Sequence, residues 1–350
     1  LKYAPGSVRV LEVLRALTEK AGKSGFTEGA DREMAILRGV LRESPLNWPF
    51  YAAAIDQLSI RGDLYAMNEL AAGLESAGAS EGAQMYEISM GLALCYASMA
   101  PWIESQGYLS LNKAPETLVE KAREYVRVRK RAEEMRAYLV KSDSVDDTRR
   151  RLVPDALRVP AEVALADMDS GREEAERIYA SVSRMDSDPS FLKAVELTVR
   201  GNGALMKKDY SGARAFYRSA IQNRPDFLDA RKQLVEVDFQ EGAALALTGR
   251  GLKAGKRSLY DAYSGSADVI KAAGELRNWM PFVTREKFLA DAYSIRAAAI
   301  AALKAVNGIR PRDQARLAGE FKAALDEAVR LNPQSKLARD LLERYSKEGF

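Results

Sequence analysis

Histidine is absent from all 350 residues of the chain, and this absence limits the chemistry that the protein can perform. Without histidine there is no Ser-His-Asp or Cys-His nucleophile pair, no histidine metal ligand and no histidine pH switch. Catalysis would have to use carboxylates, lysine or tyrosine. Helical periodicity accounts for nearly all the acidic residues, so we expect no catalytic residue, no cofactor and no metal site. A carboxylate-based hydrolase is the enzyme alternative, and a deep pocket holding a carboxylate of strongly raised pKa would favour it.

Three other motifs that could carry chemistry fail on inspection. Cys95 is the single cysteine, which excludes an internal disulfide framework and a multi-cysteine zinc site. The glycine-rich stretch at 249–257 differs from a phosphate-binding loop, because its glycine spacing is one residue too long and Arg257 replaces the Ser or Thr that would hold magnesium. Residues 167–171 lack two of the ligands of a calcium loop. We therefore predict an exposed basic loop at 249–257 and a capped turn at 167–171.

Charge along the chain gives no reason to expect nucleic acid as a partner. The formal net charge is only +4, and it is spread over a mixed surface. A basic cluster at 127–131 is flanked by glutamates at helical spacing, which indicates a solvated, ion-paired helix face. No apolar run approaches the ~18 residues of a membrane helix, so we expect no transmembrane segment in this chain.

The elements that would position any site are helices, and the clearest pattern runs from 194 to 227. Gly201 lies where two helices would touch, and a short polar break ends before Tyr210. Ala213 and Tyr217 then recur at helical spacing, and Pro225 closes the second helix. The glycine and the small alanines allow close approach of two helices, whereas the proline cannot continue a helix. The stretch predicts a helix–turn–helix unit.

This unit resembles the tetratricopeptide repeat, whose pattern places Trp, Leu-Gly, Tyr, Ala, Phe and Pro at fixed positions over ~34 residues. Leu197 takes the Trp position, and Arg200 and Ala204 depart from the pattern. Weaker pairs, including one at 48–76 and one at 160–185, cover much of the remaining chain. The resemblance implies an all-α fold, a right-handed superhelix (solenoid) of degenerate antiparallel helix pairs.

We expect two halves in this array. Residues 1–147 form an N-terminal half with an insertion near 101–115, which follows a helix broken at Pro101. The polar segment at 142–147 is the predicted boundary. Residues 148–350 form a C-terminal half that ends with a capping helix.

The resemblance implies a non-enzymatic scaffold that binds a protein or peptide partner in the concave groove, which is lined by the first helix of each pair. In the family's geometry the groove positions are Thr198, Asn202, Leu205, Lys232, Glu236 and Asp56. Asn202 matches a position at which some relatives clamp a carboxylate. The full clamp needs several basic residues at fixed positions, and only Lys232 fits.

A component of a bacterial envelope machine is the alternative function, in which the array binds a transporter, an exported polymer or a small ligand. The chain begins at Leu1, so we expect a processed or trimmed product. We expect the protein in the periplasm or the cytoplasm, and an upstream signal or anchor that has been removed would favour the periplasm. A homo-oligomer is also compatible with the sequence, which does not identify the partner.

Overall fold

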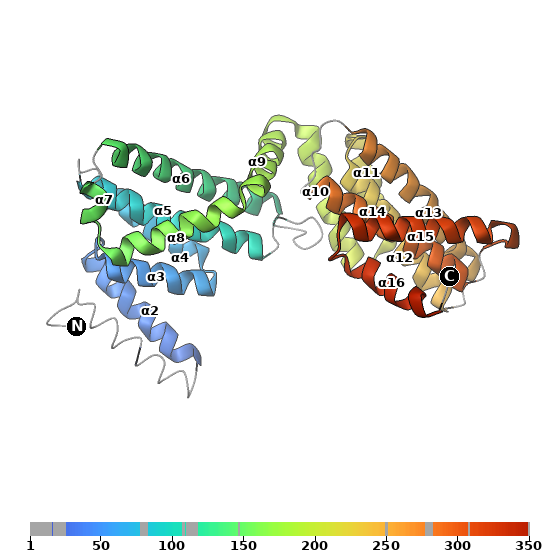
Figure 1. Ribbon diagram of the computed structural model, residues 1–350, viewed down its shortest axis with the longest axis horizontal. Helices are drawn as coiled ribbons and strands as arrows, with labels where there is room; N and C mark the ends of the chain where they lie inside the picture. Colours follow the sequence, from blue (N-terminus) through green and yellow to red (C-terminus); the bar gives the residue numbers. More distant parts are fainter. Residues whose placement is uncertain are drawn as a thin grey trace. The chain divides into compact units, whose positions relative to one another are not determined.

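The computed structural model describes residues 26–77, 83–106, 118–145, 148–248, 251–276, 283–306 and 309–348, with the isolated residues 16 and 109. Within these ranges every regular element is an α-helix except one short 3₁₀ turn, so the predicted all-α class is confirmed (Figure 1). The chain divides into two compact units, one of Leu1–Gly107 with Glu120–Glu176 and the other of Tyr108–Val119 with Arg177–Phe350, so that one division falls inside helix α9. The boundary predicted near residue 147 stays a prediction.

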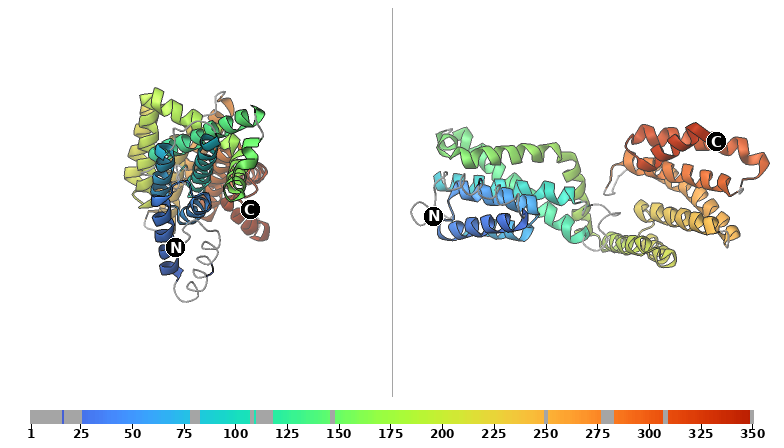
Figure 2. Two further views of the ribbon diagram at one scale, coloured as in Figure 1. Left: turned by 90° about the vertical axis from the view of Figure 1, so that its left-hand side faces the viewer. Right: turned by 90° about the horizontal axis from the view of Figure 1, so that it is seen from below.

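The first unit contains the helices from α2 to α8 and the beginning of α9, as far as Glu176. They are α2 (Phe26–Glu43), α3 (Trp48–Arg61), α4 (Leu64–Ala77), α5 (Ala83–Ser105), α6 (Leu118–Val145), α7 (Thr148–Leu152), α8 (Asp155–Ser170) and α9 (Arg172–Ser187). Helices α3, α4 and α5 lie side by side, and α8 packs on α3 and α5 (Figure 1 and Figure 2). Helix α6 is joined to α5 by polar contacts, in which Tyr125 Oη of α6 donates to Glu104 of α5 and Tyr86 Oη of α5 donates to Asp143 of α6.

The second unit continues from α9 to the end of the described chain. Its helices are α10 (Pro189–Met206), α11 (Tyr210–Asn223), α12 (Leu228–Thr248), α13 (Leu252–Glu275), α14 (Arg285–Ala305), the 3₁₀ turn η1 (Pro311–Asp313), α15 (Gln314–Leu331) and α16 (Lys336–Glu348). Each helix from α10 to α16 packs against the next, and α10, α12, α14 and α16 also contact one another in succession. This is the stacked-pair arrangement of a helical repeat, with the even-numbered helices on one side.

The predicted helix–turn–helix unit is confirmed as α10 and α11. The Asp188 side chain caps α10 by accepting from the backbone N–H groups of Ser190 and Phe191, both at 3.1 Å. Asp209 caps α11 by accepting from Gly212 N–H at 2.9 Å. Gly201 lies against the ring of Tyr217, where a Cβ atom would overlap the ring. The glycine therefore sets how closely the two helices approach, as the sequence pattern predicts.

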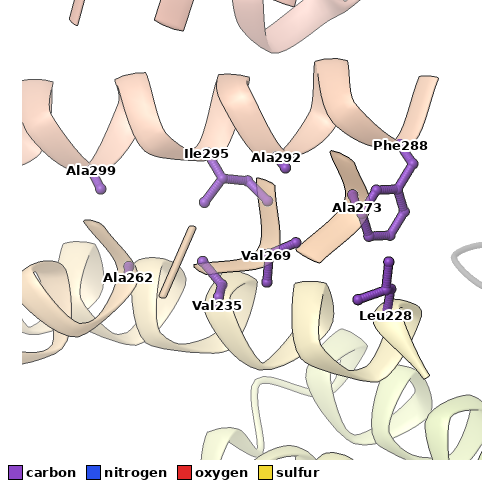
Figure 3. Close-up of a cluster of buried hydrophobic side chains, with 9 residues drawn as sticks. All are labelled: Leu228, Val235, Ala262, Val269, Ala273, Phe288, Ala292, Ile295 and Ala299. Atoms are coloured by element: carbon purple, nitrogen blue, oxygen red, sulfur yellow. The ribbon is translucent and has the colours of Figure 1, made fainter. Parts of the chain in front are cut away.

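Apolar packing links each helix pair of the second unit to the next. Figure 3 shows the central cluster, in which side chains of α12, α13 and α14 meet. Its buried members are Leu228, Val235, Ala262, Val269, Ala273, Phe288, Ala292, Ile295 and Ala299. A second cluster joins α10, α11 and α12 around Tyr217, and a third joins α14, α15 and α16 around Phe321. Because α12 and α14 each belong to two clusters, their positions are fixed from both sides.

Two local predictions are wrong. Helix α5 continues through Pro101 to Ser105, so the expected break is not there; residues 107, 108 and 110–115 of the expected insertion lie outside the described residues. The polar segment at 142–147 overlaps the last turn of α6, which ends at Val145, and its role as a boundary stays a prediction. The expected basic loop at 249–257 is mostly helix, because α13 begins at Leu252 and continues to Glu275. Gly255 is buried against α12, where a Cβ atom would meet the backbone of Gly242 and Ala246.

Candidate binding groove in the second unit

The even-numbered helices of the second unit together line a cavity of about 370 Å³, called the groove below. Residues of α10, α12, α14 and the start of α16 contribute, so four successive repeats share one site. The lining residues are Asn202, Leu205, Met206, Lys232, Gln233, Glu236, Gln240, Asp291, Ser294, Ile295, Ser335 and Leu337. One part of the lining is apolar, and the rest is polar or charged. This combination is typical of sites that orient a ligand by a few polar groups.

The structure brings four of the six expected groove residues to this cavity: Asn202, Leu205, Lys232 and Glu236. Thr198 is fully buried one turn earlier, and its hydroxyl donates to the Ala194 carbonyl at 2.8 Å. Its side chain is therefore used inside α10. Asp56 belongs to the first unit and lines a different cavity. The partner-binding role of all six residues stays a prediction.

Lys232 is held by its own chain. Its side chain is 6% exposed, and Nζ lies 3.1 Å from Asp291 Oδ2 on α14. The same ammonium lies 5.1 Å from the centre of the Phe288 ring. Because Asp291 already neutralises Lys232, the lysine is poorly placed to clamp a partner's carboxylate.

Asp229 is the residue that sequence reasoning missed. It lies in the first turn of α12, one turn before Lys232, and is only 4% exposed. Its Oδ2 atom has no hydrogen-bond partner. Burial raises the pKa of its carboxyl group to about 6, the charge of Lys232 lowers it, and the charge of Asp291 raises it further. The spacing from Asp229 to Lys232 and Glu236 puts all three residues on one helix face. That spacing was the sequence signal from which Asp229 could have been found.

Glu236 is the third acid near Lys232. Burial raises the pKa of its carboxyl group, whereas the hydrogen bond that Gln240 Nε2 donates to Oε1 at 2.7 Å favours the ionised form. Asp291 adds to the rise, and Lys232 opposes it. Two acids of the groove lining, Glu236 and Asp291, and the buried Asp229, which precedes them in the sequence, therefore act on a single ammonium group.

Asn202 lies at the α10 edge of the groove. Its Oδ1 atom accepts a hydrogen bond of 2.6 Å from Tyr217 Oη, and both side chains are buried. This bond fixes the Asn202 amide relative to α11. The residue that the sequence places in a carboxylate-clamp position thus has a structural partner as well.

The first unit has its own cavity of about 720 Å³, between α3, α5 and α8. Its lining is mainly alanine, proline and aliphatic side chains, with Asp56 and Asp167 as its acidic members. Val163, at the α8 side, is 56% exposed. The surface is suited to apolar contact, but few polar groups converge on it.

The described residues offer neither a metal-binding cluster nor a membrane-spanning helix. No group of three or more acidic, cysteine or histidine side chains there has the arrangement of a metal site. None of the described helices combines the length and apolar character needed to cross a membrane.

Comparison with known proteins gives little. No protein family and no curated protein sequence matches the chain. Among solved structures, a chain of the crystal structure of the APC/C hetero-tetramer Cut9-Hcn1 aligns over 96% of this chain and 81% of its own length. The identity is 14% and the TM-score is 0.16. The architecture described above rests on this chain's own helices and not on that alignment.

Proposed function

We propose that the protein is a non-enzymatic scaffold that binds a protein or peptide partner in the groove of its second unit. The observation that carries the proposal is the shared lining: α10, α12, α14 and α16 all contribute to one cavity. Stacked repeats present such extended surfaces to other chains. Exposed apolar side chains at the edge of the groove, Met206 at 67% and Leu337 at 37%, would be covered by a bound segment.

The test uses charge at the groove edge and a matched control on α13. The double variant Met206→Glu with Leu337→Glu should abolish capture of a partner by the full chain, because binding would bury two carboxylates without a counter-charge, which is strongly unfavourable. The control double variant Leu252→Glu with Tyr260→Glu should leave capture unchanged; the two residues are 40% and 36% exposed on α13. Photo-cross-linking of each double variant to proteins of a source-cell extract would measure how much partner it captures. Equal capture by the two double variants would contradict the proposal.

A carboxylate-based hydrolase is the second candidate. Burial raises the pKa of the carboxyl group of Glu236, which lines the groove, and that of Asp229, which lies earlier on the same helix and outside the lining. Against catalysis, Asp229 is almost inaccessible and Lys232 is already paired. Hydrolysis of chromogenic ester, glycoside or peptide substrates that is lost in Glu236→Gln would support the enzyme and refute the scaffold proposal.

The envelope alternative differs only in the occupant of the groove. A transporter, an exported polymer or a small ligand would meet the same lining residues. Fractionation of the native protein, with identification of what cross-links at Met206, distinguishes these occupants from a soluble protein partner.

A further inference from the structure

The cavity of about 720 Å³ between α3, α5 and α8, called the first-unit cavity below, has two different ends. The carboxyl ends of the three helices meet at one of them. A Cβ atom on Gly62, which follows α3, would overlap the Trp102 ring in the last turn of α5. A Cβ atom on Gly171, which follows α8, would lie 3.6 Å from Glu104 Oε1 in the same turn of α5. All three helices therefore end on the same side of the cavity.

The polar residues that line the first-unit cavity lie towards that side. Asp56 and Ser59 belong to the last two turns of α3, Ser98 to the second half of α5, and Asp167 to the last turn of α8. Ser59 Oγ is buried and has no hydrogen-bond partner. The opposite end is lined by proline and alanine, namely Pro49, Ala52, Ala53, Ala156 and Pro160. The cavity thus has a polar end and an apolar end.

The polar end carries a negative charge that the described chain does not neutralise. Asp56 and Asp167 are exposed on opposite walls, neither forms an ion pair with a described residue, and the lining includes no lysine or arginine. The last carbonyl groups of the three helices add partial negative charge there. Arg61 and Arg129, the arginines beside this end, each donate hydrogen bonds to other acceptors of the first unit. Charge complementarity therefore requires a cationic group on whatever fills this end.

The remaining lining requires an apolar body about as long as three helical turns. The α3 wall runs from Pro49 to Ser59 and the α8 wall from Ala156 to Asp167, so each wall is about 15 Å long at the rise of an α-helix. Val163 on the α8 wall is 56% exposed, and its surface would be covered by an occupant. A segment of about ten helical residues has the same length.

The backbone of an occupant decides between a helix and an extended segment. An extended segment would bring its own N–H and C=O groups against alanine, proline and aliphatic side chains, which offer them no hydrogen bonds. A helix pairs these groups within itself and presents only side chains to a groove. A lysine or arginine on such a helix can lay its apolar stem on the lining and extend its charged head to the carboxylates.

We propose that the first-unit cavity docks an amphipathic helix of a partner protein, which places an apolar stripe along α3, α5 and α8. Lysine or arginine side chains in one terminal turn of that helix meet Asp56 and Asp167. The site goes beyond the proposed function, which concerns the groove of the second unit.

The probes are four capped, dye-labelled peptides of about 16 residues, because shorter peptides form little helix in water. All have a leucine and alanine face and a glutamine face. Three carry lysine, glutamine or glutamate at one position in the first turn and one in the last, so either orientation brings one of them to the polar end. The fourth has the lysines and a central proline, which breaks the helix.

Fluorescence anisotropy with the full chain measures the four affinities. We expect the lysine peptide to bind at least tenfold more tightly than the glutamine peptide, the glutamate peptide to bind most weakly, and the central proline to weaken binding at least tenfold. Equal affinities for the lysine and glutamate peptides would overturn the cationic part of the inference. Equal affinities with and without the proline would mean an extended occupant and would overturn the helical part.

A double variant and a matched control test the two acids. Asp56→Asn with Asp167→Asn keeps the side-chain shapes and should reduce the preference for the lysine peptide over the glutamine peptide by about tenfold. Glu69→Gln with Glu120→Gln removes two exposed charges from α4 and α6, outside this cavity, and should leave the preference unchanged. The same preference in both double variants would show that the acids do not receive the cation.

The peptide measurements also separate this site from the groove of the second unit. The variant Met206→Glu with Leu337→Glu should bind the lysine peptide as the native chain does, whether or not it still captures a partner. If it loses the peptide, the peptide binds in the groove and the inference is wrong. If it keeps the peptide and loses the partner, both sites stand; if it keeps both, the inference stands and the proposed function is contradicted.

Discussion

Replacing Asp229 with asparagine should stabilise the second unit at pH 7.5. Burial raises the pKa of the carboxyl group from 3.8 to about 6, with Lys232 opposing the rise and Asp291 adding to it. A tenfold change in an acid dissociation constant corresponds to about 1.4 kcal/mol, so the ionised group costs about 3 kcal/mol of folding free energy. The first turn of α12 favours a negative charge by ~0.3–1 kcal/mol. We therefore expect Asp229→Asn to gain about 2 kcal/mol.

The gain should depend on pH with a defined sign. Because the pKa of Asp229 is higher in the folded protein than in the unfolded chain, the folded state binds more protons at this site between about pH 4 and about pH 6. Stability contributed by this carboxyl group is therefore present at low pH and falls as the pH rises through that window. The advantage of asparagine should be largest above about pH 6 and should shrink towards zero near pH 4.

Calorimetry of the full chain measures the effect directly. About 2 kcal/mol corresponds to roughly 4–8 °C in the transition temperature of a unit of this size. Asp268→Asn, with its exposed carboxylate, is the control and should change the transition by less than ~0.5 kcal/mol. If Asp229→Asn lowers stability at both pH 7.5 and pH 4.5, the carboxylate is a stabilising group, and the reasoning from its burial is refuted.

Two further outcomes are expected. Gly201→Ala should destabilise the second unit by ~1–3 kcal/mol in denaturant titrations, because the new Cβ would overlap the Tyr217 ring; a neutral effect would show that α10 and α11 separate without cost. Gly319→Ala, in open space in the middle of α15, should gain ~0.5–1 kcal/mol, and a loss would mean that the helix surface there is covered.

The helix pairs were predictable because their signals are local. Gly201, Ala213, Tyr217 and Pro225 lie within one stretch of the sequence, and each has a steric consequence that does not depend on the rest of the fold. The place of Lys232 in the groove lining was predicted from the same helical repeat pattern. The wrong predictions also have physical reasons. Proline does not end a helix when packing on both sides holds it, as at Pro101, whose neighbours Ala100 and Ile103 are buried.

The charge relations of the groove were not predictable from local spacing. Asp291 lies 59 residues from Lys232, and only the packing of α12 against α14 joins them. An aspartate in the first turn of a helix is explained by its favourable interaction with the helix dipole, so nothing in the sequence marked Asp229 as an unusual residue. Its burial depends on how closely α14 covers the start of α12. A sequence shows which acids share a helix face, but it does not show which of them lose contact with water.

The position of α12 explains how the second unit tolerates such a group. Leu228 and Val235 pack into the cluster with α13 and α14, and Val237 packs into the cluster with α10 and α11. A helix held from both sides can keep Asp229 and Lys232 on its remaining face, because the apolar contacts supply the free energy that the buried charge costs. If that reasoning holds, the effects of Val235→Ala and Asp229→Asn on stability should be additive in denaturant titrations of the single and double variants. A coupling of more than ~0.5 kcal/mol between the two substitutions would mean that the apolar contacts and the buried charge are not independent.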